Sequence, residues 1–304
     1  MTTLIGLHMI AANAFFFAMI AYLFPGQGSQ HVGMGKDLFA LFPRELAAAQ
    51  ALLGYSVEEL CLRDSPPGAL QNTAFTQPAL FVVSGLTYLK RLRETGRQPD
   101  FAAGHSLGEY TALFAAGVFD FQTGLQLVQR RGALMARVSG GAMAAVIGLG
   151  SDRIAKVLAA EHLESVDIAN MNSPDQIVVS MLKADLDQVQ SALVRAGARA
   201  VIPLNVSGAF HSRYMAEARR EFEVFLQPYS FAEPRFPVIS NVEARPYGRA
   251  EAKRLLAEQI TCPVRWSDTI RYLMTHPGIS FEEIGPGAVL TGLLKKFPAA
   301  PVRT

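Results

Sequence analysis

The chain contains the stretch Phe101-Ala102-Ala103-Gly104-His105-Ser106-Leu107-Gly108-Glu109-Tyr110, in which an apolar run enters a glycine-flanked serine and leaves into a further apolar segment. A strand, a Gly-x-Ser-x-Gly turn and a helix in this order are typical of a nucleophile elbow, which exposes the serine hydroxyl. The flanking glycines relieve crowding in so sharp a bend. We therefore predict that Ser106 is a nucleophile and that the Leu107 N–H, at the helix N-terminus, stabilises an oxyanion. The alternative is a glycine-rich turn with an incidental serine, which the strand and helix context disfavours.

Strands and helices alternate on both sides of this elbow. The N-terminal part predicts strands at 21–24 and 101–103 and helices at about 36–53, 77–95 and 121–137. The C-terminal part predicts helices near 213–226, 249–260, 266–275 and 288–297, with strands near 236–240 and 280–284. This alternation indicates an α/β fold, with a large α/β-hydrolase-like domain whose parallel sheet is covered by helices.

The middle of the chain follows a different order. Strands at 143–149, 166–169, 176–181 and 199–204 and helices at 152–160 and 184–196 follow one another as β-α-β-β-α-β, the order of a ferredoxin-like unit. We therefore expect an N-terminal extension at 1–18, a large catalytic domain at 19–139 and 208–304, and an inserted small domain at 140–207. The cleft between the two domains is the expected place for a small-molecule site.

Composition excludes several classes of protein. Half of the 304 residues are hydrophobic and 18% are charged, as in a well-buried globular protein. Basic and acidic residues nearly balance at 28 and 26, so no nucleic-acid partner is expected. Cys61 and Cys262 are too few for a disulfide framework or a zinc site, and we expect no metal and a cytoplasmic location.

The N-terminus contains an uncharged apolar stretch, Leu4–Phe24, that is long enough to cross a membrane. It lacks the basic region and the cleavage site of a signal peptide. Its end, Tyr22-Leu23-Phe24, leads into Pro25-Gly26 and is better interpreted as the first strand of the core. We therefore expect no membrane anchor, and we interpret residues 1–18 as an extension that precedes the domain.

A serine nucleophile needs a base, and the chain has six histidines. His211 lies where the small domain returns to the large one, beside the expected cleft. His105 adjoins the serine, but consecutive side chains diverge in a tight elbow. The other four lie in the N-terminal extension, after the glycine-rich loop, at a helix–strand junction and in a turn: His8, His31, His162 and His276. Position and elimination favour His211 as the base.

Arg131 lies within an apolar helical stripe. Leu127, Val128, Leu134 and Met135 share its face of the predicted helix, whereas Arg130 points about 100° away. A guanidinium keeps its charge, so its burial demands an anionic partner. That partner is either an internal Asp or Glu or a substrate carboxylate held by the bidentate fork, and the helix alone does not choose between them.

The glycine-rich loop Pro25-Gly26-Gln27-Gly28-Ser29-Gln30 has neither the spacing of a P-loop nor that of a dinucleotide-binding loop. As a loop at the end of a strand next to the elbow, it is suited to supplying a second oxyanion N–H.

The segments described above, taken together, resemble the malonyl-CoA:acyl carrier protein transacylase family, which includes the acyltransferases of fatty-acid and polyketide synthases. They occur in order over about residues 19–297. The matching segments are Phe24-Pro-Gly-Gln-Gly-Ser-Gln30, Thr76-Gln-Pro-Ala-Leu80, Gly104-His-Ser-Leu-Gly-Glu-Tyr110, Arg131-Gly132, Asn172-Ser-Pro174, Phe210-His211-Ser212, Asn241-Val242, Pro263-Val264-Arg265-Trp266 and Glu283-Ile-Gly-Pro-Gly-Ala-Val-Leu-Thr-Gly292.

The resemblance implies a role for each matching residue. The nucleophile would be Ser106 and the base His211, with the backbone carbonyl of Gln259 orienting the imidazole. It also implies oxyanion donors at the N–H groups of Gln27 and Leu107, and a carboxylate-binding arginine at Arg131. Malonyl would pass from coenzyme A to Ser106, and then to the phosphopantetheine thiol of an acyl carrier protein, by a ping-pong mechanism with no bound cofactor.

Two residues bear on the acyl group that the resemblance implies. Leu107 and Phe210 look like those of malonyl-using members, and bulky Phe210 would crowd the α-methyl group of methylmalonyl. Gly208 departs from the commonest His-Ala-Phe-His form of the family. A single methyl group changes selectivity by only about 1–3 kcal/mol, so the preference is expected to be partial.

Three other functions compete with this one. A hydrolase that removes acyl groups from stalled carrier proteins could share the scaffold, but it would have no use for a carboxylate clamp. Ser106 and His211 argue against a non-catalytic docking subunit, and the ferredoxin-like insert argues against an ordinary esterase. The segments 119–124 and 239–247 look more like the polyketide group than the fatty-acid group, and we expect a monomer.

Overall fold

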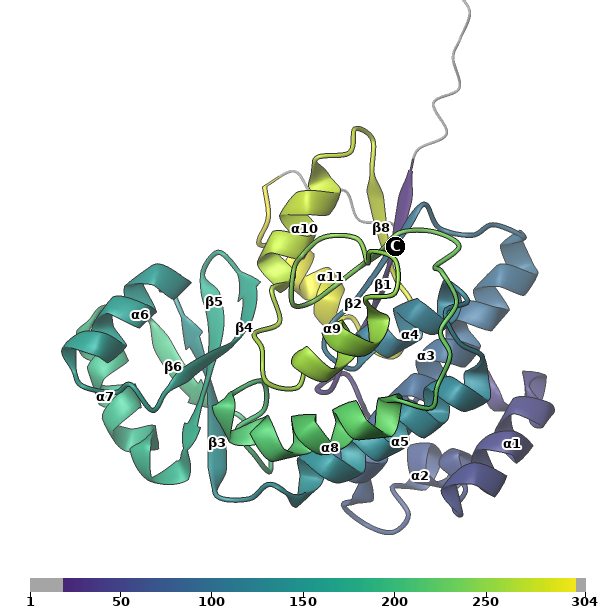
Figure 1. Cartoon of the computed structure of the whole chain (residues 1–304), viewed down its shortest axis with the longest axis horizontal. Coiled ribbons are helices and arrows are strands. Elements are labelled where there is room, and N and C mark those ends of the chain that lie inside the picture. Colours follow the sequence, from purple (N-terminus) through teal and green to yellow (C-terminus); the bar gives the residue numbers. More distant parts are fainter. Residues whose placement is uncertain (1–18, 299–304) are drawn as a thin grey trace, which may run out of the picture.

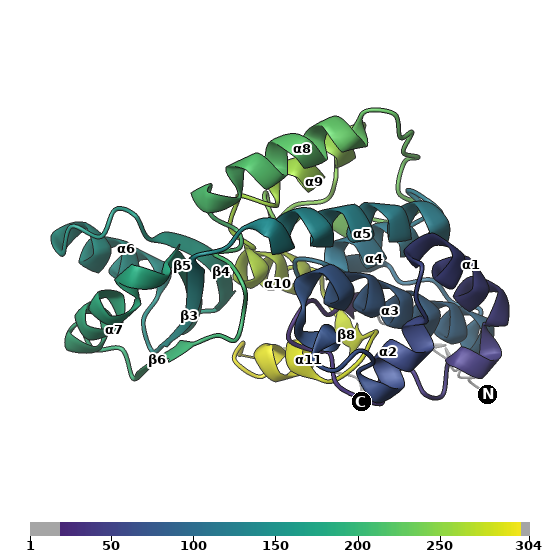
Figure 2. The same cartoon turned by 90° about the horizontal axis from the view of Figure 1, so that it is seen from below.

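The computed structural model describes residues 19–298, and these form two sheets set side by side (Figure 1). One sheet is parallel and the other antiparallel. The parallel sheet is the centre of the larger part of the molecule, and the antiparallel sheet with its two helices lies at one end (Figures 1 and 2). The predicted α/β architecture, with one parallel sheet and one ferredoxin-like element order, is confirmed.

The parallel sheet has the strand order β7-β2-β1-β8. Its strands are β1 (Ile20–Phe24), β2 (Phe101–Gly104), β7 (Val238–Ile239) and β8 (Ser280–Glu283). Every neighbouring pair is parallel, and Phe24 lies opposite Gly104 at the end of both strands. The loops that follow these strands therefore all leave from one edge of the sheet.

Alternate residues of the central strand β1 point to opposite faces of the parallel sheet. Tyr22 and Phe24 pack into the core formed with α3 (Thr73–Thr95), α4 (Gly108–Ala115) and α5 (Phe121–Arg137). Ala21 and Leu23 pack against the opposite layer of α10 (Trp266–Met274) and α11 (Val289–Leu294). Both faces are thus covered, as a parallel sheet requires.

The antiparallel sheet has the order β4-β5-β3-β6. Its elements are β3 (Gly141–Ile147), α6 (Ser151–Ala160), β4 (Asp167–Ser173), β5 (Gln176–Leu182), α7 (Leu186–Arg195) and β6 (Ala200–Pro203). Ala144 and Val146 of β3 face α6 and α7, whereas Met143 and Ala145 join the core of the larger part. One face of this sheet is therefore turned toward the parallel-sheet part.

A short backbone contact ties the two parts together. Val264 accepts a hydrogen bond from the N–H of Met171 and donates one to the carbonyl of Ala169, both at 2.9 Å. The segment that precedes α10 thus lies alongside β4, next to the end of α9 (Ala252–Glu258).

Several elements differ from the sequence prediction. The helix expected at 36–53 is a short 3₁₀ turn followed by α1 (Pro43–Leu53), because Pro43 occupies the first turn of the helix. Helix α2 (Val57–Arg63) was not predicted, although the Ser56 side chain caps it by accepting from the Glu59 N–H. The remaining elements are α8 (Ala216–Leu226) and the 3₁₀ turns Phe39–Leu41, Ala69–Gln71, Lys183–Asp185 and Arg213–Met215.

The predicted N-terminal extension, residues 1–18, lies outside the described residues, as does most of the apolar stretch that is long enough to cross a membrane. The end of that stretch forms β1, as expected. Of the helices in residues 19–298, none combines the length and the apolar character needed to cross a membrane.

Candidate active site

The elbow forms where β2 ends. The loop after β1 and the turn after β2 leave the same edge side by side, and the His105 N–H donates to the Phe24 carbonyl at 3.0 Å. The backbones approach so closely that a Cβ at Gly108 would lie 2.0 Å from the Phe24 oxygen, and one at Gly104 would lie 1.9 Å from the Gly108 carbonyl carbon. The glycines are therefore required by close approach of the backbone.

Replacing Gly104 by Ala is expected to destabilise the protein and remove activity together. A backbone clash of this kind cannot be relieved by a rotamer change, so we expect a loss of about 3 kcal/mol or more, or roughly 10 °C in Tm. Thermal unfolding followed by circular dichroism measures it. Gly292→Ala is the matched control, because nothing lies within 4 Å of the added Cβ on α11. Equal Tm values for the two variants would contradict the packing argument.

Ser106 and His211 meet in the structure although they are far apart in the chain. Ser106 Oγ lies 2.7 Å from His211 Nε2, and His211 Nδ1 lies 2.8 Å from the backbone oxygen of Gln259. A carbonyl oxygen can only accept, so Nδ1 carries the proton and donates to Gln259. In the neutral ring Nε2 is then the acceptor for the serine hydroxyl.

His211 is held in its neutral form. Its side chain is buried, and burial together with the nearby Arg131 charge lowers its pKa to about 3. A base with this pKa stays unprotonated throughout the physiological range. Ser106 and His211 also both have positive φ, 51° and 56° respectively. Backbone conformations of this kind in non-glycine residues often occur at functional sites.

Arg131 is buried on α5, and the apolar stripe predicted around it is buried with it. Its guanidinium donates to three neutral oxygens: Gln77 Oε1 at 2.9 Å, Gln259 Oε1 at 2.8 Å and Ser106 Oγ at 3.1 Å. Within residues 19–298 no carboxylate forms an ion pair with it, and its Nε has no hydrogen-bond partner. An internal carboxylate in direct contact, one of the two alternatives from the sequence, is not seen.

The two N–H groups considered as oxyanion donors line the same cleft. In the described part of the chain neither the Gln27 N–H nor the Leu107 N–H donates a hydrogen bond. The Ser106 N–H, by contrast, donates to Asn241 Oδ1 at 2.7 Å. The free donors are therefore those of Gln27 and Leu107.

A cleft of about 450 Å³ lies between the two sheets. It brings together six of the seven site residues that the sequence indicated, and the seventh, Gln259, lies fully buried behind them. The six are Gln27, Ser106, Leu107, Arg131, Phe210 and His211. The antiparallel sheet supplies the opposite wall through Ala145, Asn170, Asn172, Gln176 and Val178.

Sequence reasoning assigned no role to three buried residues of the site. Asn241 holds the elbow, accepting from the Ser106 N–H and donating to the Gly104 carbonyl at 2.7 Å. The Gln77 side-chain oxygen accepts a hydrogen bond from Arg131, and the Glu109 carboxyl group accepts one from the Gln259 side-chain amide. Glu109 could have been noticed as an acid in an apolar helix, and Asn241 as a polar residue just after a strand.

The family follows from a comparison over the whole domain. A model of the family described as "Acyl transferase domain" matches residues 21–297. The chain belongs to the acyl transferase family. The acyltransferase is 53% identical, over 92% of its length and 97% of the relative's, to the polyketide biosynthesis malonyl CoA-acyl carrier protein transacylase PksC of Bacillus subtilis.

Solved structures share the fold of this acyltransferase. The malonyl CoA-acyl carrier protein transacylase of Burkholderia pseudomallei superposes with a TM-score of 0.88 at 44% identity, covering 93% of the acyltransferase and 100% of that chain. A chain from the complex of the type II PKS acyl-carrier protein AntF with its malonyl-transacylase also gives 0.88, at 38% identity, with coverages of 93% and 94%.

Proposed function

We propose that the protein transfers malonyl from malonyl-CoA to the phosphopantetheine thiol of an acyl carrier protein in polyketide biosynthesis. The observation that carries the proposal is Arg131, a buried cation that has no ion-pair partner within residues 19–298 and whose Nη2 lies 3.1 Å from Ser106 Oγ. An acyl group on that serine would bring a free carboxylate within reach of the guanidinium. The names of the relatives above support malonyl as the acyl group and a carrier protein as the acceptor.

The mechanism that we propose is ping-pong. His211 Nε2 takes the hydroxyl proton as Ser106 Oγ attacks the thioester carbonyl, and the N–H groups of Gln27 and Leu107 hold the oxyanion. Collapse breaks the carbon–sulfur bond, and His211 returns the proton to the departing coenzyme A thiolate. The carrier thiol then gives its proton to His211 and attacks the malonyl-serine ester, and the same steps run in reverse.

We infer a cytoplasmic enzyme that needs no bound cofactor and acts as a monomer. We also propose a large domain at 19–139 and 208–304 and a small domain at 140–207, with the cleft between them as the substrate site. The hydrolase alternative has no observation in its favour, because an enzyme that clears uncharged chains has no use for a buried guanidinium beside its nucleophile.

The test is intact-protein mass spectrometry after incubation with an equimolar mixture of acyl-CoA thioesters. We expect one malonyl-sized adduct, which is discharged when a phosphopantetheinylated carrier protein is added and reappears as malonyl on the carrier. An acetyl adduct in preference to malonyl would contradict the role of Arg131. Release of free malonate at the rate of adduct loss, without a charged carrier, would favour the hydrolase.

Phe210 is expected to limit methylmalonyl use. Its ring is buried and lines the cleft beside His211. We expect Phe210→Ser to raise the ratio of kcat/KM for methylmalonyl-CoA over malonyl-CoA by roughly 10- to 200-fold, because one methyl group in a pocket is worth about 1–3 kcal/mol. The ratio comes from a competition assay and does not depend on the fraction of active protein. Phe231→Ser, which removes a ring outside the cleft, should leave the ratio unchanged.

A further inference from the structure

Glu109 is a fully buried carboxyl group on the first turn of α4. It forms no ion pair within residues 19–298 and is held by three donors instead. The Asn241 N–H lies 3.0 Å and the Tyr247 hydroxyl 2.6 Å from Oε1, and the Gln259 side-chain amide donates to Oε2. Burying an acid in this way is costly, and an apolar side chain would be the cheaper choice for packing alone.

Two of these donors belong to residues that hold the reacting groups. Gln259 accepts from His211 Nδ1 through its backbone oxygen and from Arg131 Nη2 through its side-chain oxygen. The Asn241 side chain accepts from the Ser106 N–H and donates to the Gly104 carbonyl, so it fixes the backbone of the elbow. The Glu109 carboxylate is therefore linked through a single intervening residue to each reacting group. Gln259 links it to the base and to the guanidinium, and Asn241 links it to the nucleophile.

The ionised Glu109 carboxylate sets the orientation of the Gln259 side-chain amide. A carboxylate only accepts, so it requires the amide nitrogen of Gln259, and the amide oxygen is then directed to Arg131. The same amide nitrogen donates to the Ser106 carbonyl at 2.8 Å. A group that donated at position 109 would favour the reversed amide, which would place an N–H against the guanidinium and take one of two donors from the Ser106 carbonyl, leaving the backbone N–H of Glu109 at 3.2 Å.

We propose that Glu109 is a positioning residue for transfer, which in its ionised form fixes Gln259 and thereby holds His211 and Arg131 in place at the same time. This inference rests on the proposed function, since it assigns Glu109 a part in holding the proposed base and the proposed carboxylate clamp. The Glu109 carboxyl group is hydrogen-bonded to Asn241, Tyr247 and Gln259 and not to the Ser106 hydroxyl. It is the buried acid of the site, acting on the histidine through a glutamine.

The electrostatics of Glu109 support a dependence on pH. Burial raises its pKa to about 7, against the lowering effect of its hydrogen bonds and of Arg131. The titratable and charged groups that face it are Tyr247, Arg131 and the adjacent Tyr110, and the pKa of each tyrosine is raised, so both stay neutral at pH 7. As pH falls through about 7, Glu109 gains a proton and can donate, whereas His211 with its pKa of about 3 does not change.

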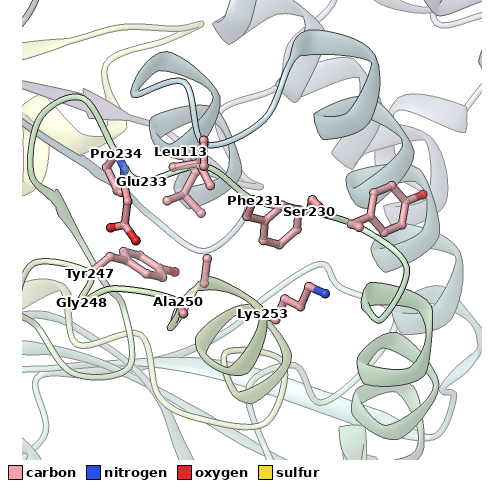
Figure 3. A pocket seen from close by; sticks show the side chains of 13 residues that line it. Leu113, Ser230, Phe231, Glu233, Pro234, Tyr247, Gly248, Ala250 and Lys253 are labelled. Atoms are coloured by element: carbon pink, nitrogen blue, oxygen red, sulfur yellow. The ribbon is translucent and has the colours of Figure 1, made fainter.

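Tyr247 offers a second way to alter the same carboxyl group. Its ring lines a separate cavity of about 370 Å³, between the loop that carries Phe231 and Pro234 and the start of α9 with Lys253 (Figure 3). Its hydroxyl donates to Glu109 Oε1. Tyr247→Phe therefore removes one donor to the carboxylate and leaves Glu109 in place, which should raise the pKa of Glu109 further.

The experiment compares pH profiles of kcat/KM for malonyl-CoA in the wild type, Glu109→Gln and Tyr247→Phe. We expect a wild-type profile that falls below about pH 7. In Glu109→Gln the fall should disappear, and the value at pH 8 should be about 10- to 100-fold lower because reacting groups are misplaced. The value of kcat/KM should fall more for malonyl-CoA than for acetyl-CoA, because the Arg131 carboxylate clamp is disturbed as well as the His211 base. In Tyr247→Phe the fall should move to higher pH with little change in the plateau.

The matched control is Glu221→Gln, which removes a carboxylate of α8 that pairs with Arg130 and Arg137 away from the cleft. It should keep the wild-type profile. The inference is overturned if Glu109→Gln keeps the wild-type fall near pH 7, or if Tyr247→Phe does not shift it. Should Glu109→Gln fail to fold, the Tyr247→Phe profile decides alone. A wild type that forms no malonyl adduct would instead refute the proposed function.

Discussion

Replacing Ser106 by Ala is expected to abolish malonyl transfer, with kcat lower by on the order of 10⁵-fold. The loss should be this large because Ser106 Oγ is the atom to which the acyl group would be bonded, and among residues 19–298 no other hydroxyl is hydrogen-bonded to His211. No adduct should form with malonyl-CoA, as measured by intact-protein mass spectrometry and by carrier charging. The fold should survive, because alanine keeps the Cβ at a φ of 51° and only the bonds of one hydroxyl are lost.

Ser191→Ala is the control for Ser106→Ala. It removes an exposed hydroxyl from α7 and should leave both adduct formation and Tm at wild-type values. A malonyl adduct of the same mass in Ser106→Ala would show that another side chain is the nucleophile. Binding of malonyl-CoA without reaction in that variant is compatible with the proposal, since Arg131 is still present.

Arg131→Ala is expected to separate malonyl from uncharged acyl groups. Hydrogen bonds to charged groups are worth about 1.5–3 kcal/mol each, so loss of a bidentate clamp should lower kcat/KM for malonyl-CoA by roughly 10²- to 10³-fold. Acetyl-CoA, which has no free carboxylate, should be used at least as well relative to malonyl-CoA as before. Both rates are measured by charging of the carrier protein on the same enzyme preparation.

Two further variants sharpen the result for Arg131. Arg130→Ala removes the neighbouring guanidinium, which pairs with Glu221 at the surface, and should change neither substrate by more than a few fold. Arg131→Lys keeps the charge but not the planar fork, so it should recover part of the malonyl rate. Unchanged malonyl kinetics in Arg131→Ala would refute the carboxylate role.

Local patterns were enough to predict the elbow and the buried face of α5. The elbow needs only glycines at two fixed positions and a strand and helix on either side, all within the stretch 101–110. The helical period alone placed Arg131 on the buried face and Arg130 on the other, and the structure confirms both positions. What the period left open was the partner of Arg131, because an ion pair is made across space and not along a helix.

The hydrogen-bond partners of the site lie far apart in the chain. His211 and Gln259 are 48 residues apart, and Glu109 and Gln259 are 150 apart. The family resemblance indicated Gln259 as the residue whose backbone carbonyl orients His211, but the sequence offered no reason to connect Gln259 with Glu109. A buried carboxyl group in an apolar helix reveals that a partner exists and not which one.

The sequence by itself determined that a serine sits on a sharp strand-to-helix turn, that a guanidinium faces the core, and that a small β-α-β-β-α-β unit interrupts the larger α/β pattern. Each of these is a statement about neighbours within a few turns or strands, where backbone geometry is set by local residues. Only the tertiary structure decided that Arg131 meets neutral oxygens beside Ser106, and that Glu109, Gln259 and His211 form one line of contacts. Those contacts arise because α3, α5, the end of α9 and the segment after β6 all pack around the turn that follows β2. No local pattern records which of these elements meet there.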